Sequence, residues 1–135
     1  MSQKGLRIIV LPVRMAICRL RPTSEVPKWA GSKGFCSITR TEEELSVVCP
    51  ESDAPDNVLS DKGWRCLKIQ GPLTLSEVGV LSSLAHPLSK AGVSIFAIST
   101  FDTDYLLVRD EELAQAILAL TQARHEVISG DGSSL

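Results

Sequence analysis

Apolar and β-branched residues dominate the stretch 93–108, apart from one short polar interruption. Residues 93–100 form a nearly unbroken apolar run, which is typical of a strand that is covered on at least one face. The polar segment 102–104 interrupts the run with Asp and Thr side chains, which hydrogen-bond their own backbone in turns. The apolar pattern then resumes over residues 105–108. The pattern predicts a β-hairpin.

Helical periodicity flanks this hairpin on both sides. Residues 73–91 carry apolar side chains at helical spacing and begin with a Thr-Leu-Ser-Glu capping box. Pro87 is expected to kink this helix or to separate its last turn, and Gly92 suits the position just after a helix end. Beyond the hairpin, Asp110 is expected to cap a second helix, whose apolar stripe runs over residues 113–120.

The first half of the chain is rich in strand patterns and poor in helical ones. Residues 22–34 contain several Pro and Gly residues and are predicted to form a loop between the first strands and the next ones. Residues 50–62 are predicted to form a polar connector. Pro12 is expected to interrupt the first strand, because proline cannot donate to a strand ladder. Strands are predicted over residues 6–11, 13–20, 35–39, 45–49, 64–70 and, near the end of the chain, 126–128.

A shift of 60 residues aligns the chain with itself without a gap. Residues 37–48, with an acidic turn at 42–44, fall on residues 97–108, with an acidic turn at 102–104. Identities are few, so the repeat rests on the pattern of two hairpins. Two copies of one supersecondary unit explain this pattern. The second copy has the order βαββαβ, whereas the first has lost the helical character of its first helix.

The order βαββαβ is that of a ferredoxin-like unit, in which helices cover one face of an antiparallel sheet. The sequence therefore predicts an α+β protein with two such units in tandem, the N-terminal one being degenerate. The expected boundaries are 1–61 for the N-terminal unit and 62–129 for the C-terminal unit, with a flexible tail over 130–135.

Composition and charge narrow the classes of function. The chain has 135 residues, 44% of them hydrophobic, and a net charge of -2. Nucleic acid is not an expected partner, because a phosphate-binding face usually shows as a basic excess. No membrane association is expected, because no apolar run reaches the ~20 residues of a membrane span. No signal peptide is recognised at the N-terminus, so the protein is expected to be soluble and cytoplasmic.

Patterns for catalysis and metal binding are weak. The four cysteines form no CxxC pair and are expected to be buried, reduced thiols. His86 and His125 lack a recognisable nucleophile context, and neither a GxGxxG nor a Walker motif is present. Asp102 and Asp104 offer two carboxylates to a divalent ion, but no third ligand can be named. The sequence favours a non-catalytic protein without metal or cofactor; an enzyme with an unrecognised site stays open as a further hypothesis.

The segment 93–108, Val-Ser-Ile-Phe-Ala-Ile-Ser-Thr-Phe-Asp-Thr-Asp-Tyr-Leu-Leu-Val, resembles a signature of tandem ACT domains. Such domains occur in the CASTOR arginine sensors, in aspartate kinases and in small bacterial ACT proteins. Residues 78–80 and 87–88 fit the same pattern in the first helix. The resemblance is strong over residues 64–128, and over 1–60 it depends mostly on the duplicated layout.

This resemblance implies a regulatory module that binds an amino acid at the interface between ACT units. It also implies a homodimer, an allosteric change in assembly or unit orientation, and a regulated protein partner. The implied ligand-binding residues lie at the helix start, on the strand and at the turn: Gly79, Val80, Ser94, Ile95, Thr100, Phe101, Asp104 and, in addition, Asp102.

Elementary chemistry agrees with such a site. A helix N-terminus suits a carboxylate, Gly79 lets a ligand approach the backbone closely, and an acidic turn offers a counter-charge to an ammonium or guanidinium group. The alternative interpretation is ordinary structure, since Asp-rich hairpin turns and glycines within helices commonly have no ligand. A structural or protein-interaction ACT module is therefore the alternative function. Arg40 and Thr41 stand where the second copy has Thr100 and Phe101, so equivalent sites in both copies are not expected.

Overall fold

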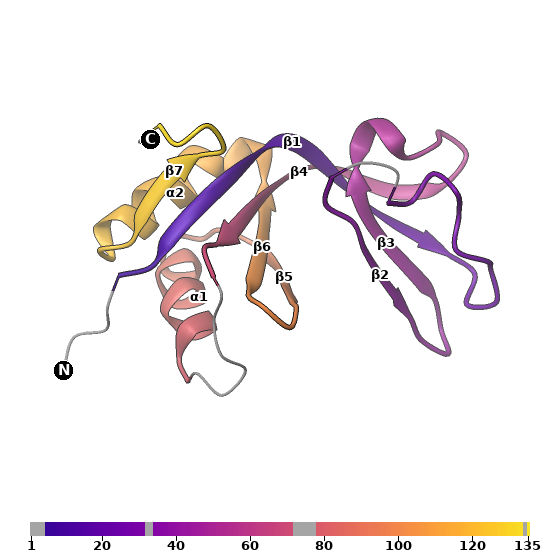
Figure 1. The fold of residues 1–135 in the computed structure, drawn as a ribbon, viewed down its shortest axis with the longest axis horizontal. Helices are drawn as coiled ribbons and strands as arrows, with labels where there is room; N and C mark the ends of the chain where they lie inside the picture. The colour runs from indigo at the N-terminus through magenta and orange to yellow at the C-terminus, as the bar shows by residue number, and fades with distance from the viewer. Residues whose placement is uncertain (1–4, 32–33, 72–77, 134) are drawn as a thin grey trace. The chain divides into compact units, whose positions relative to one another are not determined.

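The computed structural model describes residues 5–31, 34–71, 78–133 and 135. This part of the chain is α+β, as the sequence predicts (Figure 1). Its elements in chain order are β1 (Arg7–Leu20), β2 (Ser37–Arg40), β3 (Leu45–Pro50), the 3-10 helix η1 (Glu51–Asp53), β4 (Leu59–Ile69), α1 (Val80–Lys90), β5 (Ile95–Ser99), β6 (Asp104–Arg109), the 3-10 helix η2 (Asp110–Glu112), α2 (Leu113–Gln122) and β7 (Glu126–Ser129).

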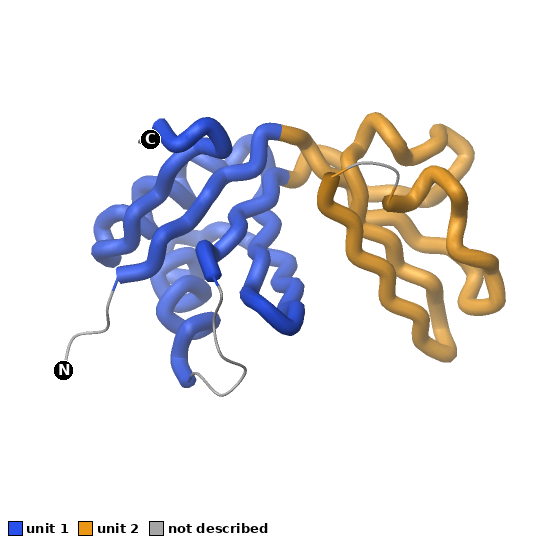
Figure 2. The backbone as a smooth tube through the Cα atoms, in the orientation of Figure 1, with its two compact units in different colours: residues 1–12, 65–135 blue, residues 13–64 orange. Residues whose placement is uncertain are grey.

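The chain forms two compact units, which Figure 2 shows in different colours. One unit contains residues 1–12 and 65–135, and the other contains residues 13–64. Strands β1 and β4 each contribute one part to each unit. This division differs from the boundaries expected from the sequence in that residues 1–12 join the C-terminal unit, because this part of β1 pairs with β4 and β7.

The sheet of the unit 1–12 and 65–135 has the strand order β7-β1-β4-β6-β5. Strands β5 and β6 pair antiparallel with Ile95 opposite Val108, which confirms the predicted hairpin. Strand β7 runs parallel to β1, with Arg7 opposite Glu126. The first strand of the chain therefore lies between β4 and the last strand.

Helices α1 and α2 cover one face of this sheet (Figure 1). Alternate residues of a strand share one face, and those facing the helices are apolar. Full burial of an aliphatic side chain stabilises the fold by about 1.5–3 kcal/mol, so packing holds both helices in place. The core contains Ile8, Val10, Leu67, Ile69, Leu106, Val108 and Val127 from the strands, Leu84, Leu88, Ala116, Ala119 and Leu120 from the helices, and Val93.

Helix α1 is shorter than predicted. It begins at Val80 rather than at residue 73, because Gly79 has a φ of 84°, a left-handed conformation that an α-helix does not contain. The predicted capping box at 74–77 lies outside the described residues. Glycine adopts this conformation without the steric penalty of a side chain, so Gly79 sets the start of the helix.

Pro87 lies inside α1 and does not separate its last turn, since the helix continues to Lys90. The helix ends as predicted, with Gly92 at a φ of 77°. The backbone N–H of Gly92 donates to the Ser89 carbonyl at 3.0 Å, and the N–H of Val93 donates to the Leu88 carbonyl at 2.9 Å. This pair of bonds is a Schellman motif, which satisfies the last carbonyls of the helix.

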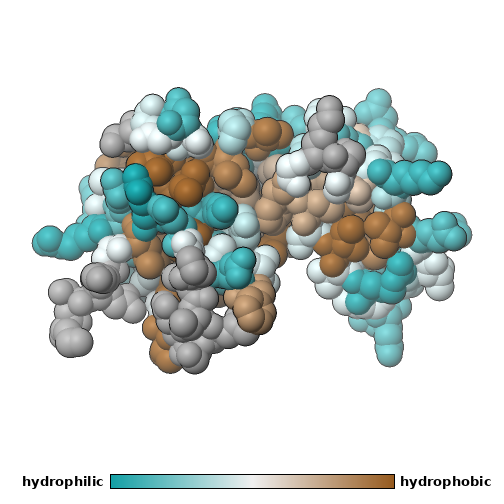
Figure 3. All heavy atoms as spheres, viewed as in Figure 1, coloured by the Kyte–Doolittle hydropathy of each residue, from teal (hydrophilic) through white to brown (hydrophobic). Residues whose placement is uncertain are grey.

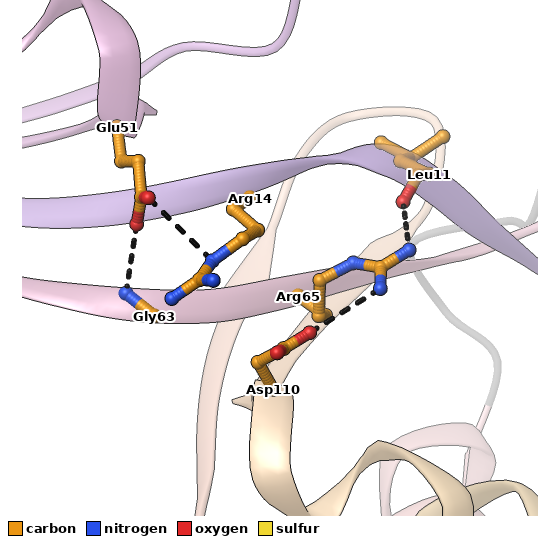
Figure 4. Close-up of polar contacts among 6 residues, drawn as sticks. All are labelled: Leu11, Arg14, Glu51, Gly63, Arg65 and Asp110. Atoms are coloured by element: carbon orange, nitrogen blue, oxygen red, sulfur yellow. Dashed lines mark hydrogen bonds and ion pairs between the residues drawn. The ribbon is translucent and has the colours of Figure 1, made fainter.

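Asp110 does not cap α2, contrary to the prediction. Residues 110–112 form η2, and α2 begins at Leu113 without a side-chain cap. The Asp110 carboxylate instead accepts a hydrogen bond from the Arg65 guanidinium at 3.3 Å, and Arg65 also donates to the carbonyl of Leu11 at 3.2 Å (Figure 4). A charge-assisted hydrogen bond to a guanidinium is stronger than a cap to a neutral backbone N–H. The Asp110 carboxylate therefore bonds Arg65 and does not cap α2.

Pro12 does not interrupt β1, which runs continuously from Arg7 to Leu20. On one side of β1, residues 7–10 pair with β7, and residues 15–20 pair with β3. Pro12 falls in the gap between these two partners. A strand tolerates proline where no neighbour needs its missing N–H, which explains why the predicted break does not occur.

The unit 13–64 is an antiparallel sheet with the order β2-β3-β1-β4, and its described residues include no α-helix. Strand β4 begins within the predicted connector 50–62. The Glu51 carboxylate accepts a hydrogen bond from the N–H of Gly63 at 3.0 Å and lies 3.5 Å from the Arg14 guanidinium (Figure 4). The order β2-β3-β1 corresponds to β5-β6-β4 of the other unit, so the hairpin recurs but the helical layer does not. A small core contains Ala16, Cys18, Leu45, Val47, Cys49 and Ala54.

Candidate functional site

The residues implied as a ligand site fall at two opposite ends of the unit 65–135. A short turn joins the end of α1 to β5, so the two elements run in opposite directions. The start of α1 therefore lies at the same end as the β5–β6 turn, and Figure 1 shows both at the lower edge of the unit. Ser94 and Ile95 follow the far end of the helix. Because α1 has 11 residues, its two ends lie about 16 Å apart.

We call the first of these places the hairpin end, comprising residues 78–81 and 100–104. Its turn is held by two threonines. The N–H and Oγ1 of Thr100 donate to the carbonyl of Thr103 at 2.8 and 3.0 Å. Thr103 is only 5% exposed, and its Oγ1 donates to the carbonyl of Ile69 at 2.7 Å. This bond secures the turn against the end of β4, a role that the local sequence pattern does not reveal.

Two carboxylates give the hairpin end a negative charge. Asp102 is exposed in the turn, and Asp104 is half-buried opposite Ser99. Among the described residues, neither carboxylate forms an ion pair. Burial raises the pKa of the Tyr105 phenol, with smaller contributions from Cys66 and from the charge of Asp102. The turn can therefore offer carboxylate oxygens to an ammonium or guanidinium group.

The start of α1 offers backbone N–H groups to the same end. The first N–H groups of any α-helix have no partner within it. Among the described residues, no side chain caps α1, and its first turn contains no acidic residue. The carbonyl of Gly79 accepts the N–H of Ser83 at 2.9 Å, which closes the first turn. Such a helix start favours a carboxylate, through both its N–H groups and its dipole.

Exposed apolar side chains accompany these polar groups. Val78 is 92% exposed and Phe101 is 80% exposed, whereas Leu81 is 38% exposed. Figure 3 shows apolar side chains interrupting the polar surface on the face it presents. Apolar side chains gathered at one end are typical of a surface that meets a ligand or a partner.

Ser94 and Ile95 are not brought together with the other implied residues. The N–H of Ser94 donates to Glu112 Oε1 at 3.3 Å, so this donor is already occupied. Ile95 lies opposite Val108 in the ladder and packs against the core. Within one unit the structure therefore places Gly79 and Val80 at the same end as the turn, and places Ser94 and Ile95 at the opposite end.

A groove of about 860 Å³ lies between α1 and α2 and includes none of the implied residues. The sequence reasoning missed it, because its lining comes from segments distant along the chain. One signal was present in the sequence: His86 and Lys90 are four residues apart, and therefore share one helix face. The lining residues are Gly5, Ser82, Ser83, His86, Pro87, Lys90, Ala91, Ala119, Gln122, Ala123 and His125.

The cysteines do not form a reactive or metal-binding centre in the part of the chain that the structure describes. All four are free, and no group of three or more His, Cys, Asp or Glu residues is placed to hold a metal ion there. Burial raises the pKa of the Cys49 and Cys66 thiols to about 12. Both are uncharged at neutral pH and therefore weak nucleophiles. Among the described helices, none has the length and apolar character to span a membrane.

Comparison with family models divides the chain in two. Residues 59–122 match the family model of the ACT domain. Residues 14–57 match a second model, which is described only as an N-terminal domain. The ACT match therefore contains the hairpin, both helices and the Asp-rich turn, whereas the first hairpin belongs to a different model.

Sequence relatives include the cytosolic arginine sensor for mTORC1 subunit 1 from two mammals. The Rattus norvegicus sensor is 32% identical over 116 residues, which are 75% of this chain and 35% of the sensor. The Homo sapiens sensor is 39% identical over 100 residues, which are 68% of this chain and 30% of the sensor. The chain thus spans only 30–35% of the length of these sensors.

Solved structures extend the similarity to the whole chain. A crystal structure of an Agrobacterium tumefaciens protein is 38% identical, with a TM-score of 0.90, and the alignment covers 98% of this chain and 99% of that one. The regulatory subunit of aspartate kinase from Thermus thermophilus has a TM-score of 0.60 at 11% identity, over 91% of this chain and 99% of that one. At this identity the likeness to the kinase subunit is one of fold alone.

Proposed function

Because this chain carries an ACT domain and belongs to the same family as the Agrobacterium tumefaciens protein, we propose that it is a non-catalytic regulatory module that binds an amino acid. The sequence relatives support the regulatory role, since they are named as a cytosolic arginine sensor. The observation that carries the proposal is the hairpin end, where the Asp102 and Asp104 carboxylates have no cationic partner among the described residues and face the same end as the start of α1.

In this proposal the two ends of the ligand meet opposite charges. The ammonium or guanidinium group of the amino acid pairs with Asp102 and Asp104. Its carboxylate accepts hydrogen bonds from the N–H groups at the start of α1, where Val80 begins the helix and Gly79 leaves room for close approach. Thr100 holds the turn, and Phe101 covers the aliphatic part of the ligand. Arginine is the first ligand to test, because the sensors named above sense it.

We further propose that the site is completed at an interface between ACT units, with a second copy of the chain on the other side. Exposed Val78 and Phe101 provide apolar surface for such a homodimer. Ser94 and Ile95 can join the site only from a second copy, since they lie at the far end of their own unit. The protein is proposed to act in the cytoplasm, as the name of the mammalian sensors indicates for those proteins.

Regulation then follows from differential affinity. A ligand shifts an equilibrium between two arrangements only if it binds one of them more tightly. Here the amino acid would favour the assembly in which the hairpin end is covered, and a regulated protein partner would distinguish the two forms. The duplicated hairpin supports a degenerate first ACT unit, over residues 13–64 of the structure rather than the expected 1–61, which serves assembly and has no equivalent site.

A thermal-shift panel with the common amino acids, each at several concentrations, tests the proposal. A ligand at ~100 times its Kd stabilises the folded state by about 2.7 kcal/mol, which raises Tm by several degrees for a chain of this size. Asp102→Asn and Asp104→Asn should abolish a saturable rise. Glu42→Gln is the matched control, since Glu42 is an exposed acid in the corresponding turn of the first hairpin. A flat panel for every amino acid overturns the proposal.

The exposed apolar side chains also support a second candidate, a protein-interaction module without a ligand. Phe101 at 80% exposure is the main observation in its favour. Sedimentation of the wild type and of Phe101→Ser separates the two functions when combined with the panel. If the wild type responds to no amino acid in the panel and Phe101→Ser no longer self-associates, the interaction module is supported. A saturable response of the wild type to an amino acid supports the sensor.

A further inference from the structure

The groove between α1 and α2 has a charge opposite to that of the whole protein. The chain carries a net charge of -2. The groove is lined by the cationic side chain of Lys90 and by His86 one turn away, and no Asp or Glu is among its described lining residues. Side chains four residues apart on a helix lie about 5–6 Å apart at Cβ. The two bases therefore face the same stretch of the groove.

Most other polar groups in the groove are already engaged. The His125 imidazole accepts the N–H of Leu6 at 3.1 Å, and its other nitrogen lies 3.1 Å from the carbonyl of Ser83. The hydroxyls of Ser82 and Ser83 donate to backbone carbonyls one turn earlier in α1. These groups form the wall and floor and have no hydrogen left to donate to a ligand.

The donors that remain are Lys90, His86 and Gln122. Within the described residues none of the three side chains has a hydrogen-bond or ion-pair partner. They come from both helices, with Gln122 at the end of α2 and the two bases on α1. An acid-free groove with donors on both walls is complementary to an anion.

Favourable interaction with the helix dipole accounts for a cation at the end of α1, and it explains Lys90 alone. It does not explain a second base at His86, one turn earlier, or the amide of Gln122 on the facing helix. The volume of about 860 Å³ is within the ~300–1,000 Å³ of small-molecule sites. An inorganic ion would leave most of such a volume empty.

We propose that this groove binds a small phosphorylated metabolite. The ammonium group of Lys90 is a compact point charge with three donors, which suits a phosphate monoester. His86 and Gln122 donate to the remaining phosphate oxygens, and the organic part of the ligand lies along Pro87 and Ala119. The site shares no residue with the hairpin end. This proposal and the proposed amino-acid site can therefore be tested separately, and the failure of one does not contradict the other.

Titration followed by two-dimensional NMR of the backbone amides tests this proposal. The probes are ribose 5-phosphate, inorganic phosphate and ribose, added separately to the full chain. Saturable shifts confined to residues 82–91 and 119–125 are expected with ribose 5-phosphate, weaker ones with phosphate, and none with ribose. Lys90→Ala should weaken ribose 5-phosphate binding about tenfold, since it removes one charge-assisted contact.

Lys28→Ala is the control variant, because it removes the same charge from an exposed lysine in the other unit. Its affinity for ribose 5-phosphate should equal that of the wild type. His86→Ala provides a second variant in the groove, should Lys90→Ala prove unstable. The absence of saturable shifts with both phosphate-bearing probes overturns the proposal, as does an equal loss in Lys28→Ala and Lys90→Ala.

Discussion

Nε2 of His125 lies 3.1 Å from the carbonyl oxygen of Ser83, the carbonyl that Pro87 leaves without a helical partner. Proline has no N–H, so the residue four positions earlier loses its usual donor. Nδ1 of His125 accepts the backbone N–H of Leu6 at 3.1 Å, so the proton of the neutral ring is on Nε2 and points to Ser83. One imidazole thus replaces the missing helical bond and connects α1 to Leu6, the residue directly before β1.

Replacement of His125 by phenylalanine is expected to lower the free energy of unfolding by about 1–3 kcal/mol. The phenyl ring is similar in size but leaves both the Ser83 carbonyl and the Leu6 N–H unsatisfied, and buried unsatisfied groups are costly. Urea denaturation measures the change. The control is His86→Phe, at the exposed histidine of α1, which should change the stability by no more than about 0.5 kcal/mol.

A second substitution tests the role of Pro87 in this relationship. In Pro87→Ala the new N–H can bond the Ser83 carbonyl within the helix. The loss caused by His125→Phe should therefore be smaller in the Pro87→Ala background than in the wild type, with a coupling of about 0.5–3 kcal/mol. Additive effects would contradict the assignment.

Thr103→Val is expected to destabilise the protein by about 1–3 kcal/mol, although it preserves the side-chain shape. The substitution removes the 2.7 Å bond from Thr103 Oγ1 and leaves the carbonyl of Ile69 without this donor in a buried place. Thr121→Val is the matched control, since its hydroxyl donates to Ile117 at the same distance but on an exposed helix face. Similar losses in the two variants, measured by urea denaturation, would argue against a special role for the turn.

The ion pairs Arg65–Asp110 and Arg7–Glu126 have nearly equal lengths, 3.3 and 3.4 Å, but differ in exposure. The Arg65 side chain is 20% exposed, whereas that of Arg7 is 50% exposed. We expect Asp110→Ala to lower the stability by about 1–2 kcal/mol, since it leaves a largely buried guanidinium without its counter-charge. Glu126→Ala should cost at most about 0.5 kcal/mol. Denaturation at low and high salt checks both values, and equal losses would disprove the distinction.

Alkaline pH should destabilise the protein through Cys66. Burial raises the pKa of this thiol from 9.0 to about 12. Above about pH 9 the Cys66 thiol ionises in the unfolded chain but stays protonated in the folded one, and this favours unfolding. The stability of the folded state is therefore fully present below pH 9 and is lost as the pH rises towards 12. In this window the free energy of unfolding should fall more steeply for the wild type than for Cys66→Ala, by roughly 1.4 kcal/mol per pH unit. Parallel slopes would contradict a shifted thiol.

Local pattern predicted most of the elements correctly. The β5–β6 hairpin, the helix end at Gly92 and the apolar stripe of α2 each depend on residues within one turn or one strand pair. The errors at Pro12 and Asp110 have different causes. Pro12 lies between the residues of β1 that pair with β7 and those that pair with β3, so no neighbour on that side needs its missing N–H. Asp110 accepts a hydrogen bond from Arg65, which is distant in sequence, and does not cap the helix that follows it.

The candidate site shows the same division. The acidic turn has a local signature in the sequence, whereas Gly79 is implied only by the family resemblance, and its place before α1 differs from the helix expected over residues 73–91. The sequence did not reveal that Ser94 and Ile95 lie at the opposite end of the unit, since this depends on the direction in which α1 and β5 pack. Nor did it reveal the groove of His86, Lys90 and Gln122, which exists only where the two helices meet.

The sequence by itself determined the α+β class, the hairpins and the helices, because hydrophobic periodicity reports the rotation per residue of each element. The tertiary structure alone decided which strands are neighbours. It placed β1 between β4 and β7, and it joined Leu6 to His125 across 119 residues. Such pairings depend on which buried polar groups and apolar faces can be satisfied together in space, and no local pattern records that choice.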